Sequence, residues 1–330
     1  MDRGSPNLTG SINGTEPPHG EESDSDQDSS SSVYSMSSGE IENHFVVRYN
    51  RRFHSPGNGN VRLYPLPVDD AEVQRLNRSH ELIKELLGGR NYWGPPPQSL
   101  VAPINAEHRV RILDVCTGNG KWVDEMAAEF PQAKVYGLDI ENVQFEIHDI
   151  NTTTRWAGGR FDIVHTRQII LTHIHYPAVL REVARILRPG GLFLAGEWLP
   201  VLFTLDGSRT STTSNGVSAF LHLVSDIAGR RGLFHNTLEI PRILMSNTYF
   251  ENVVAERRVV PLDGSTRADR TKRALLEFAD AAKYFLRDSG ISATRVEDIL
   301  QALRRDLNNA SNFSLIYLTV HARRKVYAVP

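Results

Sequence analysis

One segment decides the fold of this chain: Arg111-Ile-Leu-Asp-Val-Cys-Thr-Gly-Asn-Gly-Lys-Trp122. It begins as a short apolar strand and continues into a turn that contains Gly118 and Gly120, after which a helical pattern starts at once. A second strand, Lys134–Leu138, ends on Asp139, about nineteen residues after Gly120. This order of strand, glycine turn, helix and acid-terminated strand predicts a nucleotide-binding half of an α/β sheet.

The composition of the 330 residues narrows the class of protein. Hydrophobic residues make up 40% of the chain, which is enough for a sizeable core. A formal net charge of −2 and a pI near 6.6 argue against direct nucleic-acid binding through bulk positive charge. Cys116 is the single cysteine, which excludes an internal disulfide and argues against a cysteine-based zinc site. Since no signal peptide or membrane-spanning run is visible, we expect a cytoplasmic protein.

Residue patterns divide the chain into four parts. Residues 1–41 are rich in Ser, Asp and Glu, can bury almost nothing, and are expected to be disordered. Residues 42–109 hold a predicted helical lid and a linker. In residues 110–205, strands and helices alternate as in an α/β core. Residues 206–330 complete the fold, with a helical cap inserted at about 262–311 before a closing strand.

In the core, the alternation of patterns predicts an open, mainly parallel sheet. The proline and two glycines of Arg188-Pro-Gly-Gly191 predict a sharp turn between a helix end and a strand. The predicted strands are 110–115, 134–138, 143–147, 161–165 and 191–197, and the predicted helices are about 121–130 and 176–187.

The flanking regions are predicted to be largely helical. A helix begins at Asp69 and ends at Gly88-Gly89, and it lies either over the mouth of the site as a lid or on the sheet far from it. Its apolar face is predicted to consist of Val73, Leu76, Ile83 and Leu86. After the core, a capping box at Thr294 and Glu297 is expected to start the last helix. The predicted helices there are 217–230, 238–247, 268–287 and 294–307, and the predicted strands, which form an antiparallel edge hairpin, are Phe250–Val260 and Phe313–Ala322.

The pattern Asp114-x-x-x-Gly118-x-Gly120 differs from the glycine motif of dinucleotide enzymes and resembles motif I of class I S-adenosylmethionine (AdoMet) methyltransferases. Over roughly residues 42–325, the chain resembles fungal AdoMet-dependent methyltransferases of the LaeA and UmtA type. This resemblance implies a Rossmann-like α/β fold with residues 110–205 as the AdoMet-binding core, a mostly parallel sheet, an antiparallel edge hairpin and a helical cap. The further marks that carry it are Tyr64-Pro-Leu-Pro67, Trp122, Phe161–Arg167, Leu187–Gly191 and Glu197-Trp198.

The same resemblance implies AdoMet as cofactor and assigns roles to three acids. Asp114 is expected to help hold the ammonium group, Asp139 to accept hydrogen bonds from the ribose hydroxyls, and Asp149 to face the adenine amino group. Cys116 is expected to be buried in the turn without a nucleophilic role, and no metal is expected. The expected cofactor-binding residues are Asp114, Cys116, Thr117, Gly118, Gly120, Trp122, Asp139, Asp149, His165 and Arg167.

A catalytic base is required only for some methyl acceptors, because methyl transfer is an in-line displacement that depends mainly on alignment. A poorly acidic hydroxyl or a protonated amine needs one. His165 and Glu197 are the catalytic candidates, although a hydrogen-bonded structural histidine is the favoured interpretation of His165. Trp198 either walls the acceptor pocket or belongs to the core. Further histidines that the sequence does not exclude are His173, His175 and His222.

The spacing between Asp139 and Asp149 departs from the resemblance. The two acids are ten residues apart, whereas relatives have about twenty residues there. Only residues 140–142 separate the two predicted strands, and a crossover between parallel strands needs about a dozen residues or more. Either residues 143–148 are not the usual parallel edge strand, or the segment is shortened. We therefore expect an open adenine side and weak cofactor binding.

Two functions follow from the resemblance. The first is methyl transfer to a small molecule of fungal secondary metabolism, with the cap shaping the acceptor pocket and no membrane or nucleic-acid partner. The alternative is a nuclear regulator of secondary-metabolite genes, with protein partners and weak or vestigial methyltransferase activity. An NAD-dependent oxidoreductase is disfavoured because the third glycine and a catalytic Tyr/Lys pair are missing.

Overall fold

The computed structural model describes residues 45–55, 64–95, 109–139, 146–147, 149–172, 174–211 and 215–327. The predicted disorder of residues 1–41 and much of the predicted linker before residue 109 lie outside the described residues. His173 lies outside them as well.

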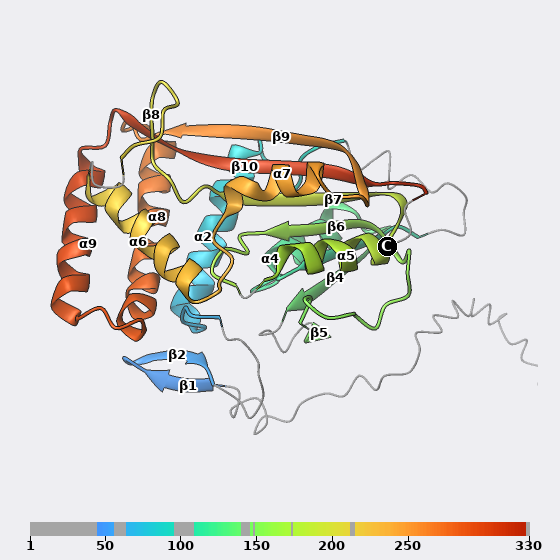
Figure 1. Cartoon of the computed structure of the whole chain (residues 1–330), viewed down its shortest axis with the longest axis horizontal. Coiled ribbons are helices and arrows are strands. Elements are labelled where there is room, and N and C mark those ends of the chain that lie inside the picture. The colour runs from blue at the N-terminus through green and yellow to red at the C-terminus, as the bar shows by residue number, and fades with distance from the viewer. Residues whose placement is uncertain are drawn as a thin grey trace, which may run out of the picture.

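A single large sheet forms the centre of the molecule (Figure 1). Its strands follow the order β5-β4-β3-β6-β7-β10, with β9 on the far side of β10 and the short β8 continuing beside β10. The first five strands are parallel, while β10 is antiparallel to both β7 and β9. The strands are β3 (Arg111–Val115), β4 (Lys134–Asp139), β5 (Glu146–Ile147), β6 (Phe161–Arg167), β7 (Leu187–Trp198), β8 (Phe203–Thr204), β9 (Phe250–Pro261) and β10 (Phe313–Arg324).

This topology confirms the predicted fold class, a Rossmann-like methyltransferase fold with a mostly parallel sheet and an antiparallel edge. The start of β7 differs most from the prediction, while β5 is shorter and β6 longer than predicted. The predicted turn at Arg188–Gly191 lies inside β7, which already begins at Leu187. The register explains this, because Phe161 pairs with Leu187 but Ile163 pairs with Leu192, so the residues between them form an irregularity.

Helices cover both faces of the sheet and enclose two cores. Trp122 and Met126 of α4 (Lys121–Glu129) pack with Ile112 of β3 on one face. Val179 of α5 (Tyr176–Ile186) packs with Leu113 on the other face, where η1 (Thr237–Glu239) and α7 (Ile240–Met245) also lie. Since successive residues of a strand point to opposite sides, the neighbours Ile112 and Leu113 stabilise the two cores separately. Full burial of each such side chain contributes about 1.5–3 kcal/mol.

Three helices form a cap at one end of the sheet (Figure 1). They are α6 (Gly216–Arg230), α8 (Thr266–Asp288) and α9 (Ala293–Asn308), and they share a third core with buried Phe220, Phe285 and Leu303. The predicted capping box at Thr294 is wrong. Ser292 is the N-cap of α9 and accepts a hydrogen bond from the Arg295 N–H at 3.2 Å, because a cap residue must precede the helix rather than lie in its first turn.

The N-terminal helix α2 (Asp70–Leu86) begins where the sequence predicts, with Asp69 as its N-cap. Its predicted apolar face is only partly correct. Val73 is 39% exposed, whereas the buried positions of α2 are Glu72, Ser79, His80, Leu82 and Ile83. Polar residues are buried here because α2 lies between α4 and α8 rather than on one apolar surface.

A two-stranded hairpin, β1 (Phe45–Arg48) and β2 (Arg51–His54), precedes α2 and was not predicted. Its two-residue loop is Tyr49-Asn50, and both residues have positive φ, as a type I′ hairpin turn requires. Tyr49 stacks on Tyr284 of α8 with ring centroids 5.4 Å apart. The hairpin therefore joins the N-terminal region to the cap.

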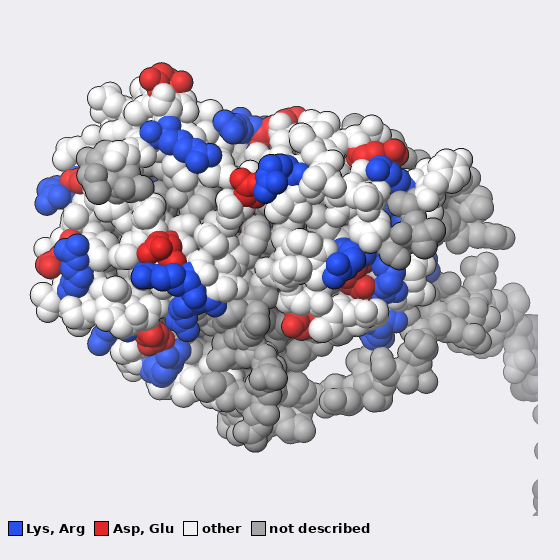
Figure 2. Space-filling view, in the orientation of Figure 1, with Lys and Arg blue, Asp and Glu red and all other residues white. Residues whose placement is uncertain are grey.

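The surface is mixed in charge on the face that Figure 2 displays. Lys and Arg lie close to Asp and Glu there, and no continuous basic stripe is visible on its described part. Among the described residues, no helix combines the length and apolar character needed to cross a bilayer.

Candidate active site

The turn after β3 is built from residues in unusual backbone conformations. Cys116, Gly118 and Gly120 have φ values of 59°, 59° and 79°. These angles favour glycine because they bring a Cβ atom close to the backbone. Cys116 adopts this strained conformation and is half-buried rather than buried as predicted. The turn is half-buried at Cys116 and Gly118 and buried at Thr117 and Gly120.

Asp139 ties this turn to the neighbouring strand. It ends β4, is largely buried, and accepts a hydrogen bond at Oδ2 from the Gly118 N–H at 2.7 Å. The Thr117 N–H donates to the Leu138 carbonyl at 3.1 Å. The turn and the strand end thus form one unit, in which a carboxylate lies beside the backbone of the turn.

Asp114 and His165 form a buried pair beneath the turn. Asp114 Oδ1 lies 2.7 Å from His165 Nδ1, and Asp114 Oδ2 accepts a hydrogen bond from the Thr117 hydroxyl at 2.9 Å. The His165 ring has no exposed surface and stacks on Trp122, with centroids 4.0 Å apart. Burial lowers the pKa of His165, so the ring is neutral and donates from Nδ1 to the carboxylate.

This pair changes the interpretation of two expected site residues. Asp114 is only 4% exposed, and both of its oxygens accept hydrogen bonds inside the protein, so its carboxylate supports the turn from within the protein. Trp122 also lies in the core, where its indole N–H donates to the Asn91 carbonyl at 2.7 Å. The cofactor contacts assigned to these residues stay predictions, and the structure gives the residues a supporting position.

The edge strand β5 is parallel to β4. The first of the two expectations, that residues 143–148 do not form a parallel edge strand, is therefore wrong for the described residues 146–147. Leu138 pairs with Glu146 and Asp139 with Ile147, so β5 lies beside the very end of β4. A strand of two residues at that position does not require the chain to return along the whole sheet, which is why a short connection suffices. The second expectation, a shortened segment, agrees with the two-residue length of β5.

Asp149 follows β5 at this edge and is exposed. Its Oδ1 accepts hydrogen bonds from the backbone N–H and the side-chain amide of Asn151, at 2.9 and 2.7 Å. The carboxylate is thereby held in a local turn. The contact of Asp149 with adenine stays a prediction, because these hydrogen bonds neither require nor prevent it.

Helix α2 lies directly over the turn. The Asn119 side chain donates to the Asn77 side chain at 2.7 Å, and Leu76 Cδ1 lies 3.7 Å from the position that a Cβ atom would take on Gly118. The Gln168 amide donates to the Ser79 hydroxyl at 2.7 Å. Of the two predicted positions for α2, these contacts match the one over the mouth of the site.

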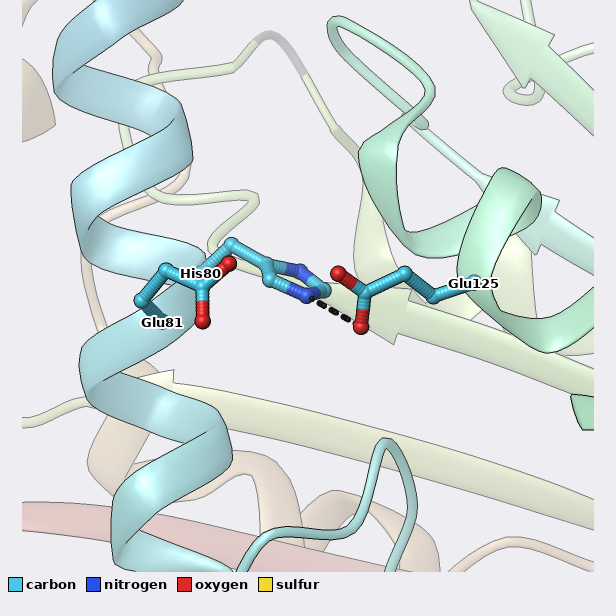
Figure 3. Close-up of side chains that lie close together, drawn as sticks. All are labelled: His80, Glu81 and Glu125. Atoms are coloured by element: carbon cyan, nitrogen blue, oxygen red, sulfur yellow. Dashed lines mark ion pairs between the residues drawn. The ribbon is translucent and has the colours of Figure 1, made fainter. Parts of the chain in front are cut away.

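His80 and Glu81 of α2 lie close to Glu125 of α4 and form, among the described residues, a cluster of possible metal ligands (Figure 3). His80 Nε2 lies 3.1 Å from Glu125 Oε2, while Arg167 donates to His80 Nδ1 at 2.9 Å. His80 is therefore neutral, as burial also lowers its pKa. Lys84 and Lys121 contact Glu125 at 2.6 and 3.1 Å. Three cations around this cluster disfavour a metal ion and favour a structural network that positions Arg167.

A cavity of about 130 Å³ lies next to the turn. Leu76 belongs to its wall and also contacts the space above Gly118, so the cavity and the turn are neighbours. The wall is mainly apolar and is formed by α2, the segment after β6, the end of β7, α6 and α8. Its residues are Tyr64, Leu66, Arg75, Leu76, Ser79, Gln168, Ile170, Glu197, Trp198, Leu199, Pro200, Leu221, Val224, Ser225, Thr271, Ala274, Leu275, Phe278 and Leu315.

Glu197 is the acidic residue of this wall and is only 1% exposed. Its Oε1 accepts a hydrogen bond from the Ile169 N–H at 2.8 Å. Burial raises the pKa of Glu197 to about 8, so its carboxyl group is mostly protonated at neutral pH. Gln168 and Leu171, which flank Ile169, have positive φ, and strain of this kind is often found at functional sites.

The other proposed bases lie elsewhere. His165 is enclosed by Asp114 and Trp122, and His175 and His222 are exposed and do not line the cavity. Trp198 does line it, as one of the two predictions for this residue stated. The sequence reasoning assigned no function to Arg75, Ser79 or Gln168, although all three line the cavity. The position of Gln168 directly after a parallel strand was the signal that could have identified it.

A family model described as a methyltransferase domain matches residues 78–220. The matched segment contains the turn after β3, Asp139, Asp149 and Glu197. The match identifies a methyltransferase domain in this segment of the chain, and the strand order agrees with that fold. S-adenosylmethionine is the expected cofactor, and a glycine turn with the Asp139 carboxylate beside it fits the chemistry of this ligand.

Fungal proteins of two kinds are similar to this chain. The "Secondary metabolism regulator laeA" of Coprinopsis cinerea is 34% identical over 163 residues, which are 46% of this chain and 40% of that protein. The "Methyltransferase pytC" of Aspergillus terreus is 29% identical over 207 residues, or 58% of this chain and 59% of that protein. The chain thus matches only about half the length of these curated relatives.

A solved structure of a Haemonchus contortus phosphoethanolamine N-methyltransferase with S-adenosylhomocysteine is also similar. Its identity is 17% and its TM-score 0.42, with 78% of this chain and 60% of that chain covered.

Proposed function

We propose that this chain transfers the methyl group of S-adenosylmethionine to a small, largely apolar molecule. The acceptor occupies the cavity between α2, α6 and α8. One observation carries the proposal: the cavity wall includes Leu76, which also lies over the glycine turn of the methyltransferase domain. An acceptor in the cavity would therefore adjoin the place where this domain type holds its methyl donor.

The residues around the turn have complementary roles in this proposal. Asp139 accepts hydrogen bonds from the ribose hydroxyls, and the backbone at Gly118 and Gly120 supports the methionine part. Helix α2 excludes water from above, because it contacts the turn through Leu76 and Asn77. Alignment and exclusion of water are the main requirements of an in-line methyl transfer. We place such an enzyme in the cytoplasm.

The test uses purified full-length chain and methyl-labelled S-adenosylmethionine. The label is offered to an organic-soluble extract of fungal metabolites and, in parallel, to the protein fraction of the same cells. We expect label in one or a few small molecules of the extract. Label confined to protein, or to neither fraction while the cofactor binds, would refute the proposal.

The regulator hypothesis is the second candidate, and the similarity to the Coprinopsis cinerea regulator is the observation that favours it. In that case the protein acts in the nucleus with protein partners. Deletion of the gene followed by metabolite profiling separates the two. Accumulation of one unmethylated intermediate supports the enzyme, and loss of many unrelated metabolites supports the regulator.

A further inference from the structure

Glu197 is buried, belongs to the cavity wall and has one carboxyl oxygen without a hydrogen-bond partner among the described residues. Its Oε2 atom is buried and has no hydrogen-bond partner among the residues that the structure describes. A buried polar atom without a partner is unfavourable by about 1–3 kcal/mol. A catalytic role is one of the explanations for such an atom. The second oxygen, Oε1, fixes the side chain by accepting from the Ile169 N–H.

The other charged groups of the cavity do not neutralise this carboxyl group. Arg75 is the basic residue of the wall, but its Nε and Nη2 atoms donate to the two oxygens of Glu72 at 2.8 and 2.5 Å. This pair has no net charge. The cavity thus combines apolar walls, an internally neutral ion pair and one buried carboxyl group at its edge.

We propose that Glu197 is the general base of the methyl transfer and that the acceptor carries a weakly acidic hydroxyl group, such as that of a phenol. This inference rests on the proposed function. The acceptor hydroxyl donates a hydrogen bond to Oε2. As the acceptor oxygen bonds to the methyl carbon and the sulfur–carbon bond breaks, the hydroxyl proton passes to Oε2. A sulfonium, a hydroxyl and a carboxylate give a sulfide, a methyl ether and a carboxylic acid.

A hydroxyl fits this environment better than an ammonium group. Below about pH 8 the Glu197 carboxyl is protonated, since burial raises its pKa to about 8, and the cavity then offers no net negative charge to a cation. The groups that face Glu197 are Arg167 of β6, Tyr176 of α5 and Tyr317 of β10, with the Arg75–Glu72 pair across the cavity. Arg167 opposes the upward shift of the pKa, while burial dominates it.

A matched pair of acceptors tests the role of the base. 2-Naphthol keeps its proton at neutral pH, whereas 2-naphthalenethiol is largely ionised and needs no base. Both are offered with S-adenosylmethionine to the full chain and to the variant Glu197→Gln, whose side chain can still accept from the Ile169 N–H. General bases contribute about 100-fold or more to rate. We expect Glu197→Gln to lose about 100-fold in methylation of the naphthol and less than about threefold in methylation of the thiol.

Two further measurements are independent of turnover. Calorimetric titration is expected to give the same S-adenosylmethionine affinity for Glu197→Gln and wild type. Infrared spectra at pH 6 are expected to contain a protonated-carboxyl band that disappears in Glu197→Gln, persists in the exposed control Glu251→Gln, and titrates near pH 8. Wild-type naphthol methylation is expected to rise with pH through the same midpoint, because only the carboxylate accepts a proton.

The outcomes separate the inference from the proposed function. Equal losses for naphthol and thiol, equal retention of both, or absence of the band would refute Glu197 as the base and leave methyl transfer intact. Failure of the wild type to methylate either compound while it binds S-adenosylmethionine would refute an aryl hydroxyl as the acceptor. The proposed function would then be refuted only if the metabolite extract also acquired no label.

Discussion

Two buried carboxyl groups at the same edge of the sheet have opposite environments. Asp114 beneath the glycine turn has both oxygens occupied, one by Thr117 and one by His165. Glu197 in the cavity wall has one oxygen occupied and one without a partner among the described residues. The first group is committed to the shape of the turn, whereas the second is available to a ligand. Burial alone therefore does not distinguish a structural acid from a chemical one.

The largest expected effect concerns the committed group. Asp114→Ala leaves the buried His165 ring and the Thr117 hydroxyl without an acceptor, which is expected to lower the free energy of unfolding by about 3 kcal/mol. The exposed Asp124 on α4 is the control, and Asp124→Ala is expected to change stability by less than about 0.5 kcal/mol. Urea unfolding measures both. Equal effects would mean that the Asp114 network does not support the turn.

Glu197→Gln is expected to raise stability in a pH-dependent way. The folded-state pKa of about 8 exceeds the ordinary value of 4.5, so the folded protein binds more protons than the unfolded chain between these values. The stability of the wild type therefore falls as pH rises from about 4.5 to 8, while that of the glutamine variant does not. We expect similar stability at pH 5 and an advantage of about 2 kcal/mol for the variant at pH 9. Thermal unfolding at both pH values measures this, and a difference that is the same at both would contradict it.

The ribose and adenine sides of the expected cofactor site are expected to differ in how much a carboxylate contributes to cofactor affinity. Asp139→Asn weakens charge-assisted hydrogen bonds, and a loss of about 1.4 kcal/mol lowers S-adenosylmethionine affinity about tenfold. Asp149 follows the short edge strand and its carboxylate is exposed. Asp149→Asn is therefore expected to change the S-adenosylmethionine affinity less than about threefold. Isothermal titration calorimetry measures both constants. A larger loss for Asp149→Asn would show that the adenine side is not open.

The smallest effect concerns the cap that walls the cavity. Ser292→Ala removes the N-cap of α9 and is expected to lower stability by about 1 kcal/mol. Thr294→Ala, inside the first turn, is the matched control and is expected to change stability by only a few tenths of a kcal/mol. Neither variant is expected to alter cofactor affinity, since α9 does not line the cavity. A greater effect of Thr294→Ala would restore the original capping prediction.

The fold was largely predictable because its signals are local. The turn at Gly118 and Gly120 and the acid at Asp139 stand next to the strands that they terminate, and sheet order follows from the alternation of strands and helices. The hairpin around Tyr49-Asn50 was missed because its loop lacks the usual glycine. The bulge in β7 depends on register with β6, which no local pattern encodes.

The site was less predictable because its parts meet only in the folded chain. Leu76, Gln168, Glu197 and Phe278 come from separate elements and share one cavity. The sequence placed Glu197 at a strand end, but it did not separate this residue from the four histidine candidates. What distinguishes Glu197 from the described histidine candidates is its place in the cavity wall, a property of packing rather than of sequence.

A structure of the full chain with bound S-adenosylhomocysteine tests the central claim most directly. We expect the ribose hydroxyls to bind Asp139 and the sulfur atom to face the cavity lined by Leu76 and Glu197. A nucleoside bound away from Asp139, or a sulfur atom with no access to this cavity, would contradict the account.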